Sequence, residues 1–307
     1  MKKLIALLAV VAVLAAVPAL AQTRLTLGYS PAHAFMPAFV AKEQGYFAKR
    51  GLDVTMRLLP LGPMVINALV SGDVQIVTLT PPVIILASEG GIEVQMVAAA
   101  VNQSKANPTT AVFARQGSNI KAPADFRGKK IATPTINAVL HVAFMKWLKN
   151  AGVDHRQVNF VEVPFPQLSD MMKSGIIDGA LVVEPFMTTI QKSNSGYLVS
   201  RYVADIADSY LEAFYATTRQ YAQANPKALA DFREALREGV AWIAKNPDAA
   251  RKTLVTYLKL PEPVAMSMPM ADFVVDAKPA DMQFWVDLCK EFGVTKGTVS
   301  AAQLVAR

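Results

Sequence analysis

The chain has 307 residues, a formal net charge of +7 at pH 7 and a single cysteine, Cys289. One cysteine excludes an internal disulfide and any metal site built from several cysteines. The basic residues are scattered and form no stripe interleaved with aromatic residues, so nucleic acid is not an expected partner. The histidines lie far apart in sequence, and we expect no metal and no cofactor.

The first 21 residues have the pattern of a secretory signal peptide. Lys2 and Lys3 make a positive start, residues 4–17 are an unbroken apolar run, and residues 19–21 match a small-x-small cleavage site. The apolar run is shorter than the ~20 residues that a membrane-spanning helix needs, which makes a membrane anchor the weaker alternative. The pattern predicts cleavage after Ala21 and a periplasmic mature protein.

Short strand-like runs then alternate with helical patterns, and the helices end near Gly51 and Gly72. The strands expected in this first part cover residues 25–29, 53–59, 74–79 and 93–101. Strands that alternate with helices are typical of βαβ units around a mainly parallel sheet.

A polar stretch at residues 102–110 interrupts this pattern, and a second alternation follows. Its expected strands cover residues 110–114, 130–133, 158–163, 178–183 and 197–200. From Asp205 the chain is expected to be mostly helical, with these helices packed back on the first unit. Asn225-Pro226 is a typical helix start.

These patterns predict an α/β fold with two lobes, each a mainly parallel sheet flanked by helices. Lobe 1 comprises residues 22–107 plus 205–307, lobe 2 is inserted as residues 108–204, and two hinge crossovers lie near Asn107 and Ala204. Ligands of open parallel sheets bind outside the carboxyl ends of the strands. We therefore expect a cleft between the lobes that closes over a ligand.

Four segments resemble motifs of one family, and they occur in order along most of the mature chain. They are GYFAKRGLDV at 45–54, ALVSGDV at 68–74, DFRGKKIA at 125–132 and SGIIDGALVVEPF at 174–186. This set is similar to the NMT1/THI5-like, or SsuA-like, family of periplasmic proteins, which includes binders of alkanesulfonates, taurine, nitrate and thiamine precursors. The resemblance implies a type II periplasmic-binding fold and, as partners, an ABC permease and its ATPase.

In lobe 1, the candidate ligand contacts are polar or aromatic side chains in loops after strands. They are Ser30, His33 and Phe35 after the first strand, Thr78 and Thr80 after the third, and Asn102 after the fourth. Structural alternatives stay open for most of them. His33 could be exposed or a cap, the threonines could cap a helix, and Asn102 could satisfy the hinge backbone.

In lobe 2, the candidates follow strands in the same way. They are Thr133, Thr135, Asn137, His141, Glu184 and Phe186. The resemblance implies that the loop at 133–137 grips a polar ligand head. A carboxylate at Glu184 could accept a hydrogen bond from an amine, a ring N–H or a hydroxyl group, or could only stabilise a helix N-terminus. Phe186, with Phe165, could form an aromatic wall.

No arginine or lysine falls clearly in these loops, which disfavours an inorganic oxyanion held by a bidentate arginine. A small organic molecule with a polar head and a flat or apolar body fits better. The sequence thus predicts a monomeric solute-binding protein for an ABC importer, not an enzyme. The alternatives are a ligand-presenting sensor subunit or an enzyme of the same fold. Iron-binding pyrimidine-precursor synthases of that fold carry a cysteine-rich segment that Cys289 alone cannot supply.

Overall fold

The computed structural model describes residues 22–59, 63–276 and 278–306. The predicted signal peptide and its cleavage site after Ala21 lie outside these ranges. Within the described ranges, no helix is both long and apolar enough to span a lipid bilayer.

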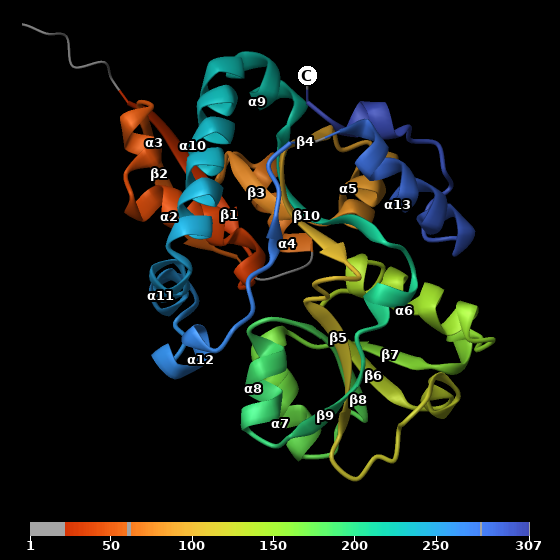
Figure 1. Ribbon diagram of the computed structural model, residues 1–307. Helices are drawn as coiled ribbons and strands as arrows, with labels where there is room; N and C mark the ends of the chain where they lie inside the picture. The colour runs from red at the N-terminus through yellow and green to blue at the C-terminus, as the bar shows by residue number, and fades with distance from the viewer. Residues whose placement is uncertain (1–21, 60–62, 277, 307) are drawn as a thin grey trace, which may run out of the picture.

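Figure 1 shows two β-sheets, one above the other in this view, with helices around each. The first sheet has six strands in the order β11-β4-β10-β3-β1-β2. Because β10 is antiparallel to both β3 and β4, the strands β1 to β4 share one direction. The strands are β1 (Thr23–Tyr29), β2 (Leu52–Leu58), β3 (Ile76–Leu79), β4 (Val94–Ser104), β10 (Ser209–Thr218) and β11 (Asp272–Phe273).

The second sheet has five strands in the order β7-β6-β8-β5-β9. Strand β6 is parallel to β7 and β8, whereas β5 is antiparallel to β8 and β9. Both sheets are therefore mixed, although four strands of each share a direction. The strands are β5 (Thr110–Arg115), β6 (Lys130–Thr133), β7 (Asn159–Glu162), β8 (Gly179–Val183) and β9 (Gly196–Ser200).

The antiparallel strands β5 and β10 each follow a segment that crosses between the sheets. One crossing covers residues 105–109, between β4 and β5, and the other covers residues 201–208, between β9 and β10. A parallel neighbour requires a long crossover, usually a helix, but these connections are short. The crossing strands thus enter each sheet against the direction of their neighbours.

The prediction that the chain is mostly helical after Asp205 is wrong for residues 209–218. These residues form β10, which lies between β3 and β4, and its interior residues are buried without alternation. A strand covered on both faces does not show the period of two that marks a half-exposed strand. After β10 the regular elements are helices apart from the two-residue strand β11, and α10 starts at Pro226 as predicted.

Helices cover both sheets, and the longest of them packs on the first one (Figure 1). There Phe232 of α10 stacks on Phe47 with the ring centroids 5.3 Å apart. Gly239 of α10 lies so close to the Pro37 carbonyl oxygen that an added Cβ would be 2.6 Å away. The helices are α2 (Met36–Glu43), α3 (Tyr46–Lys49), α4 (Pro63–Val70), α5 (Pro81–Glu89), α6 (Val139–Asn150), α7 (Leu168–Lys173), α8 (Phe186–Lys192), α9 (Arg219–Ala224), α10 (Pro226–Lys245), α11 (Pro247–Leu258), α12 (Glu262–Met266) and α13 (Pro279–Glu291).

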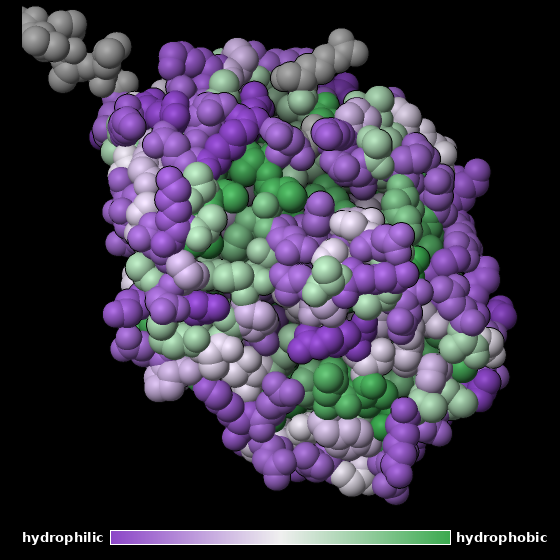
Figure 2. Space-filling model, viewed as in Figure 1, coloured by the Kyte–Doolittle hydropathy of each residue, from purple (hydrophilic) through white to green (hydrophobic). Residues whose placement is uncertain are grey.

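The last long helix, α13, holds the single cysteine in the core. Trp285 of α13 donates from its ring nitrogen to the Leu211 carbonyl oxygen at 2.6 Å, which ties the helix to β10. Cys289 is fully buried, and burial raises the pKa of its thiol to about 12. The face seen in Figure 2 is mostly hydrophilic, with its apolar residues gathered in hollows.

Candidate functional site

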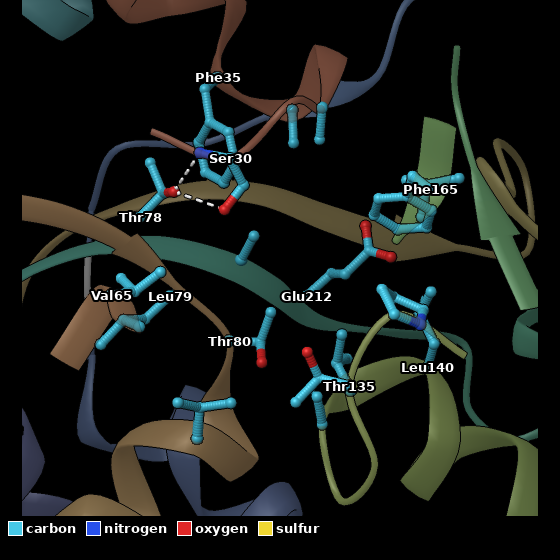
Figure 3. A pocket seen from close by; sticks show the side chains of 18 of the residues that line it. Ser30, Phe35, Val65, Thr78, Leu79, Thr80, Thr135, Leu140, Phe165 and Glu212 are labelled. Carbon is cyan, nitrogen blue, oxygen red and sulfur yellow. Dashed lines mark hydrogen bonds between the residues drawn. The ribbon is translucent and has the colours of Figure 1, made fainter. Parts of the chain in front are cut away.

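A cleft lies between the two sheets, and strands β8 and β10 both reach it. On the side of the first sheet it is lined by the loops after β1 and β3 and by parts of α4 and α5. On the side of the second sheet the lining comes from the loop after β6, the start of α6 and Phe165. Figure 3 shows labelled side chains from both sides around a common space. Six of the predicted contacts line this cleft: Ser30, His33, Phe35, Thr78, Thr80 and Thr135.

Ser30 and Thr78 form a buried hydrogen-bonded pair on the first-sheet side. Strands β1 and β3 are parallel neighbours, so their carboxyl ends bring the two residues together. The Ser30 backbone N–H donates to Thr78 Oγ1 at 2.9 Å, and the two hydroxyl oxygens lie 3.1 Å apart (Figure 3). Thr78 therefore acts mainly as a fixed support for the loop that carries Ser30.

His33 is the most unusual group in this loop. Its side chain is buried, and neither ring nitrogen has a hydrogen-bond partner among the residues that the structure describes. Burial lowers the pKa of His33 to about 4, so the imidazole is neutral near pH 7. A neutral imidazole has one donor and one acceptor. The Glu184 backbone carbonyl acts on the donor and partly opposes the lowering of the pKa, so the acceptor nitrogen is the atom left for a molecule in the cleft.

Thr80 precedes α5 but does not cap it. The helix starts with Pro81 and Pro82, and no side-chain hydrogen bond caps its N-terminus. The Thr80 hydroxyl oxygen is buried and has no hydrogen-bond partner in the described part of the chain. An unpaired buried hydroxyl group is costly, so a ligand hydrogen bond at Thr80 would be favourable.

Glu212 on β10 also lines the cleft, and sequence reasoning missed it. Its side chain is buried, and its carboxylate accepts hydrogen bonds from Thr110 Oγ1 and Gln103 Nε2, each at 2.6 Å. Burial raises the pKa of Glu212, and these two hydrogen bonds oppose that shift. A lone acidic residue inside the apolar run at 210–216 is the signal that could have identified it.

The bonds of Glu212 join the two crossing segments. Gln103 is near the end of β4, Thr110 begins β5, and Glu212 follows the second crossing. The Gln103 side chain also bonds Thr109, accepting from its backbone N–H at 3.0 Å and donating to its hydroxyl at 2.7 Å. The network therefore places a carboxylate of the cleft at the point where both connections between the sheets meet.

Six other predicted contacts do not line the cleft: Asn102, Thr133, Asn137, His141, Glu184 and Phe186. Asn102 is not at a strand end, because β4 continues to Ser104, and it pairs there with Leu211 and Asp272. Thr133 is buried at the end of β6. As ligand contacts, all six stay predictions.

The polar groups of this set on the second-sheet side bond mainly within their own loops. The Asn137 backbone N–H donates to His141 Nδ1 at 3.1 Å, and the His141 ring packs edge-on against Phe160. Burial lowers the pKa of His141 to about 4. Glu184 accepts from the Thr188 backbone N–H and hydroxyl, both at 3.1 Å, as expected for a residue that stabilises the start of a helix.

Phe186 lies behind the aromatic wall that was predicted for the cleft. Its ring stacks on Phe165 with the centroids 4.8 Å apart, and Phe165 is the ring that lines the cleft. Phe165 thus contributes apolar surface to the cleft, and Phe186 supports it.

The cleft is poor in charge. No lysine or arginine is found among its lining residues in the described ranges, and only Glu212 and His33 can ionise there. Among the same residues, no group of three or more acidic, histidine or cysteine side chains could hold a metal ion. The site can therefore bind a small molecule by burial and a few directed hydrogen bonds.

Comparison with known families supplies the context of this cleft. The family model described as "NMT1/THI5 like" matches residues 32–250. The chain belongs to the NMT1/THI5-like family. This membership confirms the resemblance of the four sequence motifs.

Members of the NMT1/THI5-like family include binding proteins with related sequences. The taurine-binding periplasmic protein of Escherichia coli (strain K12) is 29% identical over 232 residues, which are 75% of this chain and 68% of that protein. The formylaminopyrimidine-binding protein of Halalkalibacterium halodurans is 28% identical over 227 residues, which are 73% of this chain and 66% of that protein. These relatives are binding proteins rather than enzymes.

Solved structures show the same fold. The alkanesulfonate-binding protein SsuA from Xanthomonas axonopodis pv. citri, bound to MOPS, superposes with a TM-score of 0.79 at 18% identity and covers 93% of this chain and 99% of that one. The periplasmic nitrate-binding protein NrtA from Synechocystis PCC 6803 has a TM-score of 0.73 at 17% identity, with coverages of 91% and 83%. The predicted two-lobe type II periplasmic-binding fold is confirmed.

Proposed function

We propose that this protein is a periplasmic solute-binding protein that captures a small organic molecule in the cleft and delivers it to an ABC permease and its ATPase. In this proposal residues 1–21 direct export and are removed after Ala21, and the mature protein is a monomer without catalytic activity. The observation that carries the proposal is a cleft between two sheets of the NMT1/THI5-like fold, in which buried polar atoms of His33 and Thr80 have no hydrogen-bond partner among the described residues.

We further propose that the lobes, residues 22–107 plus 205–307 and residues 108–204, rotate about the two crossing segments. Contacts between the two halves would then form on closure. Glu291 of α13 pairs with Lys149 of α6 at 2.8 Å and with Lys146 at 3.1 Å, and Lys192 of α8 donates to the Pro263 carbonyl oxygen at 3.0 Å. Such partly exposed ion pairs contribute about 0–1 kcal/mol each, so a ligand can decide which state is populated.

The proposal predicts that the natural ligand stabilises and compacts the protein. Small molecules released by denaturing protein from its source cells are identified by mass spectrometry and added back to the ligand-free protein. We expect a higher melting temperature, a smaller radius of gyration in X-ray scattering, and recovery of the compound unchanged. Unchanged scattering at saturation would contradict closure, and chemical conversion of the compound would contradict a pure binding role.

A further inference from the structure

An anion-binding site needs positive charge, but the ionisable side chains that line this cleft are one acidic residue and one histidine. Glu212 forms no ion pair with a cation in the described part of the chain, and Thr110 and Gln103 are the groups that donate hydrogen bonds to its carboxylate there. His33 is neutral near pH 7 because of its burial. At that pH the lining residues therefore supply no positive charge to a bound molecule.

Two helix starts on the first-sheet side of the cleft offer few backbone N–H groups to an anion, whereas the start of α6 on the opposite side has no proline in its first turn. An anion at a helix start is normally held by free backbone N–H groups of the first turn. At α5 the first two positions are Pro81 and Pro82, which have no N–H group. Pro37 likewise occupies the first turn of α2. Both proline positions remove donors that a sulfonate or nitrate group would use.

The remaining polar atoms favour a ligand that donates hydrogen bonds. Each carboxylate oxygen of Glu212 accepts one bond from the protein and has capacity for another. In Figure 3 this carboxylate lies beside Phe165 and projects from β10 toward the space that the labelled side chains surround. Apolar groups such as Phe35, Leu140 and Phe165 make up much of the rest of the lining.

We propose that the cleft takes a small organic molecule with a protonated or strongly donating nitrogen on an apolar or flat body, and that Glu212 accepts from this nitrogen while His33 and Thr80 bind a second polar group. The proposal rests on the function proposed above and names its ligand class. It separates this protein from neighbours described as binders of alkanesulfonates or nitrate, and taurine, which carries both a protonated nitrogen and a sulfonate, meets only the first part of this description. A sulfonate beside the buried Glu212 would add a second negative charge where burial already disfavours the first.

The position of Glu212 on β10 couples ligand binding to closure of the cleft. A ligand nitrogen at Glu212 would contact the residue whose oxygens hold Gln103 and Thr110, at the ends of the first crossing segment. Burial of the nitrogen against the carboxylate is most complete when the second-sheet side, with Phe165 and Leu140, covers the cleft. Binding at Glu212 and closure would therefore support each other.

The test compares matched pairs of compounds that share a body and differ in the head group. The probes are 2-phenylethylamine with 2-phenylethanesulfonate, benzylamine with phenylmethanesulfonate, and butylamine with butanesulfonate, measured by calorimetry at pH 7 on the mature protein freed of ligand. We expect the amine of at least one pair to bind at least about tenfold more tightly than its sulfonate partner, a difference of about 1.4 kcal/mol. Tighter binding of the sulfonates would overturn the ligand class but leave the solute-binding function in place.

A variant pair assigns the effect to Glu212. Glu212→Gln removes the charge and keeps the shape, and Glu238→Gln does the same to a partly buried carboxylate of α10 that pairs with Arg50 outside the cleft lining. We expect Glu212→Gln to weaken amine binding at least about tenfold and Glu238→Gln to change it less than about twofold. Equal effects of the two variants would overturn the role of Glu212. If Glu212→Gln does not fold, the amine–sulfonate preference of the unaltered protein still decides the ligand class.

A different result would count against the solute-binding function itself. In that result no probe binds, and no small molecule is released from protein taken from its source cells. That result would overturn the solute-binding proposal and, with it, the ligand class.

Discussion

On the first-sheet side of the cleft, buried polar atoms of His33 and Thr80 have no partner in the described part of the chain. On the second-sheet side, His141 and Glu184 are also buried, but each bonds backbone groups of its own loop or helix. Thr135 is the one polar side chain of that side in the described lining. The comparison teaches that burial alone does not mark a ligand contact: the Glu184 carboxylate and His141 Nδ1 fix their own loops, and only His141 Nε2 on that side matches the unpartnered state of the His33 and Thr80 atoms among the described residues.

The largest expected effect concerns the two buried histidines, whose pKa values are both lowered to about 4. Between pH 6.5 and about 4 the unfolded chain binds a proton at each position and the folded protein does not. Stability is therefore lost as the pH falls through this window, by up to about 3 kcal/mol per histidine. We expect His33→Asn and His141→Asn each to flatten the pH dependence of urea unfolding between pH 7 and 4.5.

The same two variants separate the two sides of the cleft by ligand affinity. His33→Asn is expected to weaken binding of the solute released from the protein, whereas His141→Asn leaves it within about twofold. Glu184 and Glu212 have raised pKa values that act in the opposite direction on stability, but both variants retain them. If a variant keeps the full pH dependence of the parent protein's unfolding free energy, the pKa of the replaced histidine is not lowered by folding.

A smaller effect on the free energy of unfolding is expected from replacing two buried threonines, one on each side of the cleft, that hydrogen-bond neighbouring residues. Thr78→Val removes the acceptor of the buried Ser30 N–H, which we expect to cost about 2 kcal/mol. Thr188→Val leaves the backbone bond from Thr188 to Glu184 intact, so we expect a cost of about 1 kcal/mol. Urea unfolding at pH 7 measures both, and a larger loss for Thr188→Val would reverse the comparison.

The smallest expected effect is on the two threonines at the cleft surface. Thr80→Val removes a buried hydroxyl group without a described protein partner, and we expect ligand affinity to fall about fivefold, or about 1 kcal/mol. Thr135→Val on the opposite side is expected to change affinity less than about twofold. Calorimetry with the released solute checks both, and equal losses would mean that the second-sheet side also recognises polar groups.

Much of the fold could be predicted because its local signals are strong. Strand β1 covers Thr23–Tyr29 where residues 25–29 were expected, and Gly51 and Gly72 end helices with positive φ angles of 72° and 80°. Strand β10 could not be predicted in the same way, since it is buried on both faces and shows no alternation. Its antiparallel direction depends on the short crossing segments, which local sequence patterns do not describe.

The site was predictable only where strand ends identify it. Ser30 and Thr80 follow the neighbouring strands β1 and β3, Thr78 lies near the end of β3, and the rule for parallel sheets places all three at one edge. The same rule could not separate Thr80, which has a free hydroxyl group, from Glu184, which bonds the first turn of α8. Glu212 lies inside a strand, so no rule about strand ends could have identified it.

The buried thiol of Cys289 makes this protein convenient for spectroscopy. With a pKa of about 12 and no exposed surface, the thiol forms almost no reactive thiolate near neutral pH. Because the chain has no other cysteine, a pair introduced at exposed positions, one on each half, would take up fluorescent dyes almost exclusively. Opening and shutting of single molecules could then be followed by energy transfer without first deleting a native cysteine.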